Sequence, residues 1–331
     1  MDTTGTLDEA LERLHTSGPE RNGWLSNHGP MAVEALVRGG QSATVHRWLD
    51  HYRAKLEDMP DPLAQVTAAN WREALGDPRR VADWTAYFER EIAERPWREV
   101  LAEWWPRLLP GIAAGATHPV IRVGHAVRTL LDGGDTAPRL AELAHGLGYW
   151  AARHQPLPPL TSLPAGSTAA AALDAVPLVR QEGGIRDRLA RLTAFPAWPD
   201  PAGDPEAQLT ELVRASVHRY ATHGHGEPVM LVHAATAPNA VLRTLPALPR
   251  TLWTPSLEAA WAASAAVTAA YAASGPAPYT STRLTGEELF ERAAQHGDDH
   301  TIKFTDTALD VGDEIARDAA LRSIELNPPV L

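Results

Sequence analysis

The sequence predicts an all-α protein that forms a single large helical domain over residues 1–331. Three observations predict this class. Apolar residues recur every three or four positions through most of the chain, which is the spacing of one face of a helix. Proline and glycine stand where helices begin and end. No run of four or more residues combines alternating apolar and polar positions with β-branched side chains, so we expect strands to be marginal at most.

The first two expected helices follow from apolar spacing. Near the N-terminus, a short run has a spacing of three or four residues (Leu7, Leu11, Leu14). A longer run over residues 81–92 has the same spacing (Val81, Trp84, Phe88, Ile92). Asp77 and Pro78 precede this second run and suit the cap and the first turn of a helix. Pro96 follows it and predicts its end.

Later elements are delimited by proline and glycine. Segment 97–131 predicts a pair of helices that proline interrupts (Pro106, Pro110, Pro119). Thr285 and Glu288 have the spacing of a capping box, which predicts the start of a helix, and Gly297 predicts its end. Two segments rich in proline and glycine, 156–168 and 196–205, predict long loops or insertions within the domain.

Composition excludes several classes of protein. The chain has no cysteine, which rules out disulfides, thiolate-bound metals and a thiol nucleophile. A net charge of −11 argues against a nucleic-acid partner. The acidic N-terminus lacks an apolar signal segment, and the alanine-rich stretch 259–273 is too short and too weakly apolar to span a bilayer. We therefore expect a cytoplasmic protein without a membrane partner, and its oligomeric state is left open.

Two residue types are used unusually. The chain has 11 tryptophans beside four phenylalanines. We interpret the tryptophans first as core filling, because each buries a large area, and as a pocket for a flat aromatic ligand only in the alternative. Among the 30 basic residues only Lys55 and Lys303 are lysines, so each lysine invites a specific explanation.

The fourteen histidines are the main candidates for catalytic or metal-binding residues. Five stand at expected helix ends or among apolar residues, where an unpaired imidazole would be costly: His28, His118, His125, His233 and His300. Each alone is explained as a core histidine or a helix cap, but five together favour a shared polar site. His118 and His125 are separated by about 10 Å along a helix axis. We therefore expect one of them to bind a metal and the other to lie behind it or face the substrate.

Lys303 lies between Ile302 and Phe304, in a chain that otherwise uses arginine. Burial lowers the pKa of lysine, whereas arginine keeps its proton. A neutral lysine can act as a base, or it can capture carbon dioxide as a carbamate, which is an anionic oxygen ligand. His300 and Lys303 are three residues apart and share a helix face, so both side chains can reach one centre.

We do not expect the remaining histidines to take part in a metal or catalytic site. His223, His225 and Glu227 would suit an iron site with two histidines and a carboxylate if they lay on a strand. The intervening glycines and the helical surroundings predict a loop instead, so we expect both histidines to be dispensable. Five others have polar neighbours and are expected to be solvated (His15, His46, His51, His154, His218).

Five segments resemble the questin oxidase-like family over about residues 27–310: NHGPMAVEAL (27–36), ALGDPRRVADW (74–84), residues 96–128, LVHAATAPNAV (231–241) and DDHTIKFTDTAL (298–309). The block 96–128 is the most specific. The resemblance implies oxidation and opening of anthraquinone-type rings in secondary metabolism, formally a Baeyer–Villiger oxidation, without flavin or NAD(P). It also implies a histidine-rich mononuclear iron in some members. The matching positions are His28, His118, His125, His233, His300 and Lys303. Pro119 departs from the small residue expected there, which places His118 at a helix start.

Our first hypothesis is an oxygenase that acts on an aromatic polyketide, a phenol or quinone, with dioxygen. The ligands of its non-haem iron (Fe²⁺) would be drawn from four histidines, with Lys303 as a carbamate ligand (His28, His118, His233, His300). His125 would lie behind the ligands or act as a general base. Zinc in place of iron stays open. The first alternative is a metal-free and flavin-free oxygenase that uses a histidine as general base. The second alternative is a non-catalytic helical protein that binds a ligand.

Overall fold

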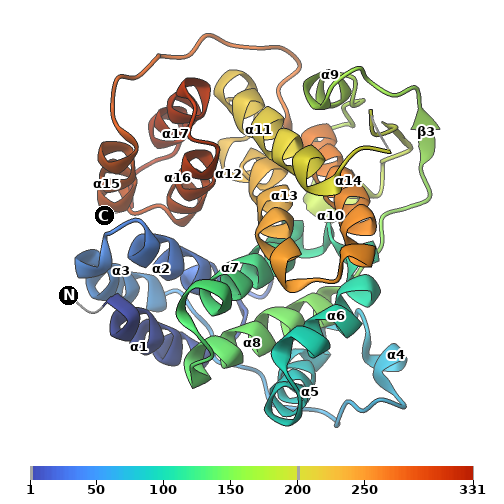
Figure 1. Cartoon of the computed structure of the whole chain (residues 1–331), viewed down its shortest axis with the longest axis vertical. Coiled ribbons are helices and arrows are strands. Elements are labelled where there is room, and N and C mark those ends of the chain that lie inside the picture. Colours follow the sequence, from blue (N-terminus) through green and yellow to red (C-terminus); the bar gives the residue numbers. More distant parts are fainter. Residues whose placement is uncertain (1–2, 200–201, 331) are drawn as a thin grey trace. The chain divides into compact units, whose positions relative to one another are not determined.

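The predicted all-α class is confirmed. The computed structural model describes residues 3–199 and 202–330, and helices make up most of their regular structure (Figure 1). The described strands form two short pairs, one antiparallel and one parallel: β1 (Glu20–Arg21) with β2 (Leu25–Ser26), and β3 (Thr161–Leu163) with β4 (Ala194–Pro196). The chain forms two compact units, one of residues 1–156 and 243–252, the other of residues 157–242 and 253–331.

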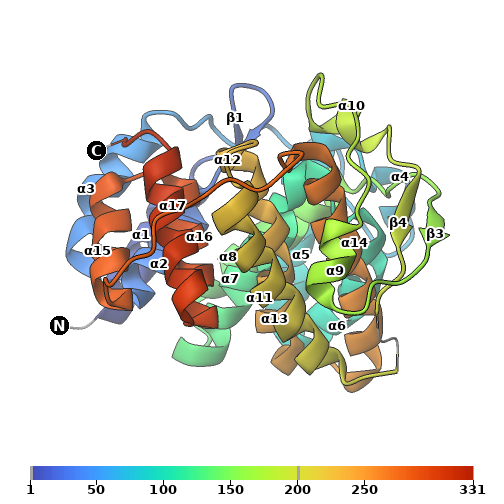
Figure 2. The ribbon, with the colours of Figure 1, turned by 90° about the horizontal axis from the view of Figure 1, so that it is seen from above.

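The first unit is a group of helices in which α8 contacts both α5 and α7, while α1, α2 and α3 contact one another (Figures 1 and 2). Its α-helices are α1 (Thr3–His15), α2 (Gly29–Arg38), α3 (Ser42–Arg53), α4 (Trp71–Ala74), α5 (Val81–Glu94), α6 (Trp97–Leu108), α7 (His118–Gly133) and α8 (Ala137–Arg153). Its 3₁₀ helices are η1 (Pro78–Arg80), η2 (Leu109–Gly111), η3 (Ala114–Thr117), η4 (Leu245–Ala247) and η5 (Arg250–Leu252).

Tryptophans fill the core of the first unit. Trp84 and Trp104 meet edge to face with ring centroids 5.3 Å apart, and both are fully buried. Trp105 and Trp150 form a second edge-to-face pair, also at 5.3 Å. Such pairs add about 0.5–1.5 kcal/mol beyond the area that they bury. For these four residues the core interpretation of the tryptophan content is confirmed.

Helix α5 has the predicted extent, but the predicted break at Pro106 is wrong. Asp77 caps the turn η1 in front of α5, and α5 ends two residues before Pro96. Pro106 lies inside α6, which continues to Leu108 before the chain turns into η2. A proline disrupts the turn on its N-terminal side, but the residues after it can still complete their own hydrogen bonds. Pro119 begins α7, as predicted.

The second unit packs α16 against α17 and α11, while α14 contacts α11 and α12 (Figure 2). Apolar residues from these helices form a buried core that includes Val217, Leu231, Val267 and Phe304. The helices are α9 (Ala169–Asp174), α10 (Ile185–Leu189), α11 (Pro205–His223), α12 (Pro228–Leu231), α13 (His233–Thr244), α14 (Trp253–Tyr271), α15 (Gly286–His296), α16 (Asp299–Val311) and α17 (Glu314–Leu326).

Both predicted loops are present, and the first also contains a short strand. Segment 156–168 contains β3, and segment 196–205 runs from the end of β4 to the start of α11. Residues 200–201 of the second loop lie outside the described residues. None of the described helices, the alanine-rich α14 included, is both long and apolar enough to cross a membrane.

The predicted capping box at the start of α15 is confirmed. The Thr285 hydroxyl accepts from the Glu288 backbone N–H at 3.2 Å, and the Glu288 carboxylate accepts from the Thr285 backbone N–H at 2.7 Å. Gly297 ends the helix with a φ of 78°, a conformation that glycine adopts without steric cost.

Thr285→Ala should lower the free energy of unfolding by about 1 kcal/mol, because the Glu288 backbone N–H loses its partner, the Thr285 hydroxyl. Denaturant titration of the full chain measures the change. Thr280→Ala, in an exposed segment of the same unit, is the control and should stay within about 0.5 kcal/mol. Equal effects of the two substitutions would show that the box contributes nothing.

Candidate metal centre

The four histidines predicted as ligands all stand at helix N-termini. His28 is the cap of α2, and His118 is the first residue of α7. His233 begins α13, and His300 is the second residue of α16. The positive end of a helix dipole disfavours a protonated imidazole. The neutral imidazole is the form that binds a metal.

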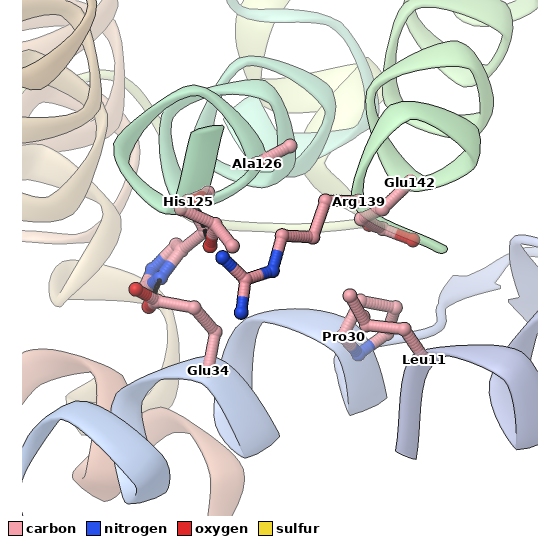
Figure 3. A pocket seen from close by; sticks show the side chains of 8 residues that line it. Leu11, Pro30, Glu34, His125, Ala126, Arg139 and Glu142 are labelled. Atoms are coloured by element: carbon pink, nitrogen blue, oxygen red, sulfur yellow. Dashed lines mark hydrogen bonds and ion pairs between the residues drawn. The ribbon is translucent and has the colours of Figure 1, made fainter. Parts of the chain in front are cut away.

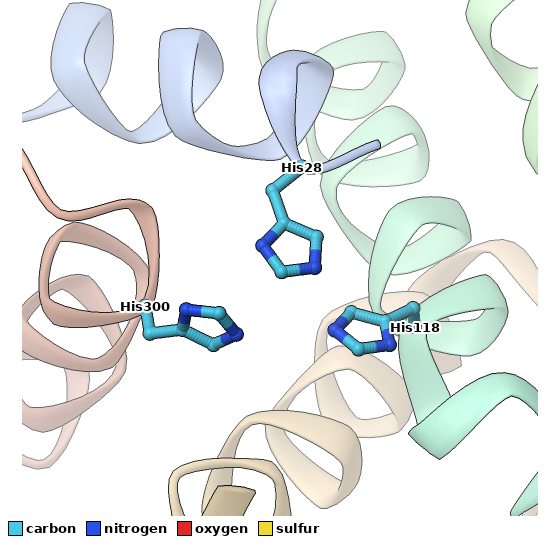
Figure 4. Close-up of side chains that lie close together, drawn as sticks. All are labelled: His28, His118 and His300. Carbon is cyan, nitrogen blue, oxygen red and sulfur yellow. The ribbon is translucent and has the colours of Figure 1, made fainter. Parts of the chain in front are cut away.

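In the first unit, His28 and His118 stack on each other. Their ring centroids are 4.4 Å apart and their planes differ by 20° (Figure 4). Both residues are buried. His118 Nδ1 lies 2.6 Å from the Gly115 carbonyl oxygen and donates a hydrogen bond to it. With the proton on Nδ1, the lone pair of His118 stays on Nε2, the nitrogen through which a metal would bind.

A left-handed turn sets the position of His118. Gly115, Ala116 and Thr117 have φ angles of 56°, 55° and 65°. Glycine adopts this conformation freely, but Ala116 and the β-branched Thr117 do not. Each left-handed non-glycine residue costs about 1–2 kcal/mol. The turn brings the Gly115 carbonyl onto His118 Nδ1, so the strain lies next to a predicted ligand, as is common at functional sites.

In the second unit, His233 and His300 lie edge to face, with ring centroids 5.4 Å apart. His233 Nδ1 donates to the Met230 carbonyl oxygen at 2.9 Å, which leaves the lone pair on Nε2. His300 Nδ1 is 2.9 Å from Asp299 Oδ1. The same hydrogen-bond arrangement therefore presents Nε2 of His118, His233 and His300.

Two carboxylates accompany His300. One ligand atom from each of Asp298, Asp299 and His300 lies within 4.8 Å of the others. Burial by itself would lower the pKa of His300, but the charge of Asp299 and the hydrogen bonds to both carboxylates outweigh burial and raise it. This corner of the second unit therefore attracts positive charge, and a divalent cation can replace the proton.

Lys303, one turn further along α16, is fully buried. Its Nζ has no hydrogen-bond partner among the described residues. Burial lowers the pKa of Lys303 to about 8, although Asp299 and Asp298 oppose the change. A usable fraction of the amine is therefore neutral near pH 7, and this is the reactive form.

These residues suit a transition metal. Each unit supplies two buried imidazoles, and the second unit adds carboxylates and a lysine whose carbamate would be anionic. Imidazole nitrogens with an anionic oxygen form a donor set for divalent iron or zinc. The orphaned amine of Lys303 is the buried polar group that such a ligand set would explain.

His125 has different surroundings from the other histidines. Its Nδ1 lies 2.6 Å from Glu34 Oε2, and Arg128 binds the same carboxylate. Glu34 and His125 face each other at one end of a small pocket, and Glu142 lies at the other end (Figure 3). The cavity volume is about 10 Å³, enough for about one water molecule. His125 is thus held by an acid of its own unit.

Sequence reasoning missed Glu34, Arg128, Glu142 and His145 as partners of histidines. One signal was present, because Glu34 is the only charged residue in the stretch 27–37. A lone acid in an apolar helix usually has a buried partner. The partner itself, His125, lies 91 residues away, and no local pattern points to it.

The prediction that His15 and His218 are solvated is wrong. His15 Nε2 lies 3.0 Å from Glu142 Oε2, and the His15 ring stacks on His145 at 4.6 Å. His218 bonds to Asp313 at 2.9 Å. Their charged neighbours in the sequence predicted that both histidines are exposed to solvent. Instead, each histidine side chain contacts a carboxylate from a distant part of the chain. His154 is half-buried, whereas His51 is exposed as predicted.

The loop prediction for His223 and His225 is half right. His223 is the last residue of α11 and bonds to the neighbouring Thr222 hydroxyl at 2.8 Å. His225 is exposed in the turn that follows. The two side chains therefore do not share a strand.

Fold and donors together define an all-α protein with a histidine-rich candidate metal centre. A family model described as questin oxidase-like matches residues 25–308. The chain therefore belongs to the questin oxidase-like family, as the resemblance implied, and membership implies an oxidoreductase. No curated protein matches the sequence. The match runs through both units, and a single domain over residues 1–331 stays a prediction.

The strained turn can be tested by a glycine substitution. Ala116→Gly relieves about 1–2 kcal/mol of left-handed strain and loses about 0.5–1 kcal/mol through unfolded-state entropy. We expect the protein to become slightly more stable, as measured by denaturant titration. Ala113→Gly is the matched control, because Ala113 is equally buried but right-handed, with a φ of −81°. It should destabilise, and an equal loss at both positions would contradict strain at Ala116.

Proposed function

We propose that this protein is a non-haem iron oxygenase that acts on an aromatic polyketide, a phenol or quinone. It would insert oxygen into an anthraquinone-type ring or open it. The observation that supports the proposal is the set of buried histidines at helix N-termini, in three of which Nδ1 bonds to an oxygen atom, in a chain of this family (His118, His233, His300). Bound Fe²⁺ would supply the redox activation of dioxygen that no side chain can supply.

The ligands of the iron would be His28, His118, His233 and His300, with Lys303 as a fifth. The proposal is for a single metal centre per chain. Four neutral imidazoles at positive helix ends leave a divalent cation uncompensated. A carbamate on Lys303 supplies a negative charge. It forms when the neutral amine bonds to the carbon of CO₂ and releases one proton.

His125 would be the general base. Its lowered pKa, due mainly to burial, keeps the imidazole neutral near pH 7. A neutral imidazole can take the proton of a phenolic hydroxyl on Nε2. The resulting phenolate is richer in electrons than the phenol, which favours its oxidation. The buried surroundings of His125 leave room for about one water molecule and keep bulk water from this step.

Oxygen uptake with a hydroxyanthraquinone tests the function. Protein expressed with added iron and purified without chelator should consume dioxygen and incorporate labelled oxygen into the product, as seen by mass spectrometry. Elemental analysis of the same sample should find iron. Turnover without any bound transition metal would favour the metal-free oxygenase. Absence of turnover with a series of phenols and quinones would contradict an oxygenase.

Lys303→Arg should abolish metal binding and activity. Arginine cannot form the carbamate, and its permanent charge repels the metal by about 4 kcal/mol per unit charge at 4 Å and an effective dielectric of about 20. Metal content and oxygen uptake measure the loss, and circular dichroism checks folding. Lys55→Arg changes the only other lysine, which is not buried, and should leave both unchanged. A Lys303→Arg variant that keeps its metal would remove Lys303 from the centre.

The double variant His223→Ala, His225→Ala should keep its metal and its activity. These residues lie at the end of α11 and in the following turn, and neither is buried. Solvated histidines without supporting partners rarely bind a metal tightly. Loss of iron from this variant would overturn the ligand assignment.

A further inference from the structure

A buried ion cluster surrounds the Glu34 carboxylate in the first unit. Oε1 accepts a hydrogen bond from Arg128 Nε at 2.9 Å. Oε2 accepts from Arg128 Nη2 and from His125 Nδ1, the latter at 2.6 Å. The three residues are 6%, 6% and 3% exposed (Glu34, Arg128, His125). Both oxygens of the carboxylate are therefore occupied by donors.

This arrangement determines where His125 carries its proton. Arginine can only donate, so Arg128 keeps the carboxylate an acceptor. His125 Nδ1 lies 2.6 Å from Glu34 Oε2 and 3.3 Å from Arg128 Nη2, so it donates along the shorter contact to Glu34, and the lone pair of the ring stays on Nε2. Burial opposes ionisation of Glu34, but Arg128 and His125 outweigh it and lower the pKa of Glu34 to about 2. Glu34 thus remains an anion throughout the neutral range.

We propose that Glu34 and Arg128 are positioning residues that fix the Nδ1–H tautomer of His125 and so make Nε2 the base. The inference rests on the proposed function. When Nε2 takes the phenolic proton, the N–H bond forms as the substrate O–H bond breaks, and the electron pair stays on the phenolate oxygen. His125 becomes an imidazolium, and the adjacent Glu34 carboxylate stabilises its charge. Glu34 does not take the proton, because Arg128 holds it as an anion.

The same unit contains a matched cluster in a different orientation. Glu142 accepts from Arg122 Nε at 2.6 Å and from Arg122 Nη2 at 2.7 Å. Its Oε2 also lies 3.0 Å from His15 Nε2. The pKa of Glu142 is lowered to about 2, as for Glu34. Glu142 contacts Nε2 of a different histidine, so it provides a control with the same burial and charge.

Glu34→Gln is the decisive variant. The carbonyl of the new side-chain amide would stay with Arg128, and the amide N–H groups would face His125 Nδ1. The proton of His125 would then move to Nε2, which could no longer act as a base. We expect kcat to fall by about 10²- to 10⁴-fold, the range for a lost general base or its orienting carboxylate. KM should change little, because substrate contacts are unaltered. Glu142→Gln should keep kcat, with a similar loss of thermal stability.

Nitrogen-15 shifts of the His125 ring give a second readout that does not need turnover. In the full chain with diamagnetic Zn²⁺ in place of iron, wild-type protein should show Nδ1 protonated and Nε2 unprotonated. Glu34→Gln should reverse this pattern, and Glu142→Gln should not.

A wild-type ring protonated on Nε2 overturns the proposal, as does a folded Glu34→Gln variant with normal kcat. If Glu34→Gln does not fold, the wild-type shifts alone decide. If wild-type protein turns over no aromatic substrate, the proposed function fails, and the shifts still test the tautomer separately.

Discussion

An imidazole binds a metal or takes a proton only through the nitrogen that carries its lone pair, and the hydrogen bond at the other nitrogen decides which one that is. For four of the histidines predicted to form the site, that hydrogen bond is made at Nδ1. The acceptor is a backbone carbonyl for His118 and His233, and a carboxylate for His125 and His300. Carbonyl acceptors stay neutral, whereas carboxylates raise the basicity of the ring. The carboxylates outweigh burial at His300 and raise its pKa, whereas burial outweighs Glu34 at His125 and lowers its pKa.

The carbonyl acceptors lie just before the helix starts, and the turn that positions the one at His118 is strained. The oxygen that His118 or His233 contacts belongs to the residue three positions earlier, which a turn before the helix brings into reach. For His118 the turn requires left-handed Ala116 and Thr117. The positive helix ends also oppose a bound cation. Negative charge at Asp298, Asp299 and a carbamate on Lys303 would offset this opposition.

Much of the helical fold could be predicted from local sequence. Apolar spacing and caps located α5 and α15, since both signals arise within one helix. Prolines at first turns also placed His28 and His118 at helix starts. The partners of His125 and His15 could not be predicted, because Glu34 and Glu142 are 91 and 127 residues away. Pairing over such separations depends on tertiary packing, which local patterns do not encode.

The central claim, which remains a proposal, is that the predicted histidines and Lys303 bind one metal ion per chain. Metal content per chain in wild-type protein and in the single variants His118→Ala and His300→Ala tests it most directly. The account predicts close to one metal per chain in wild-type protein and almost none in either variant, with the fold retained by circular dichroism. Two metals per chain, with each variant losing only one, would contradict a single centre.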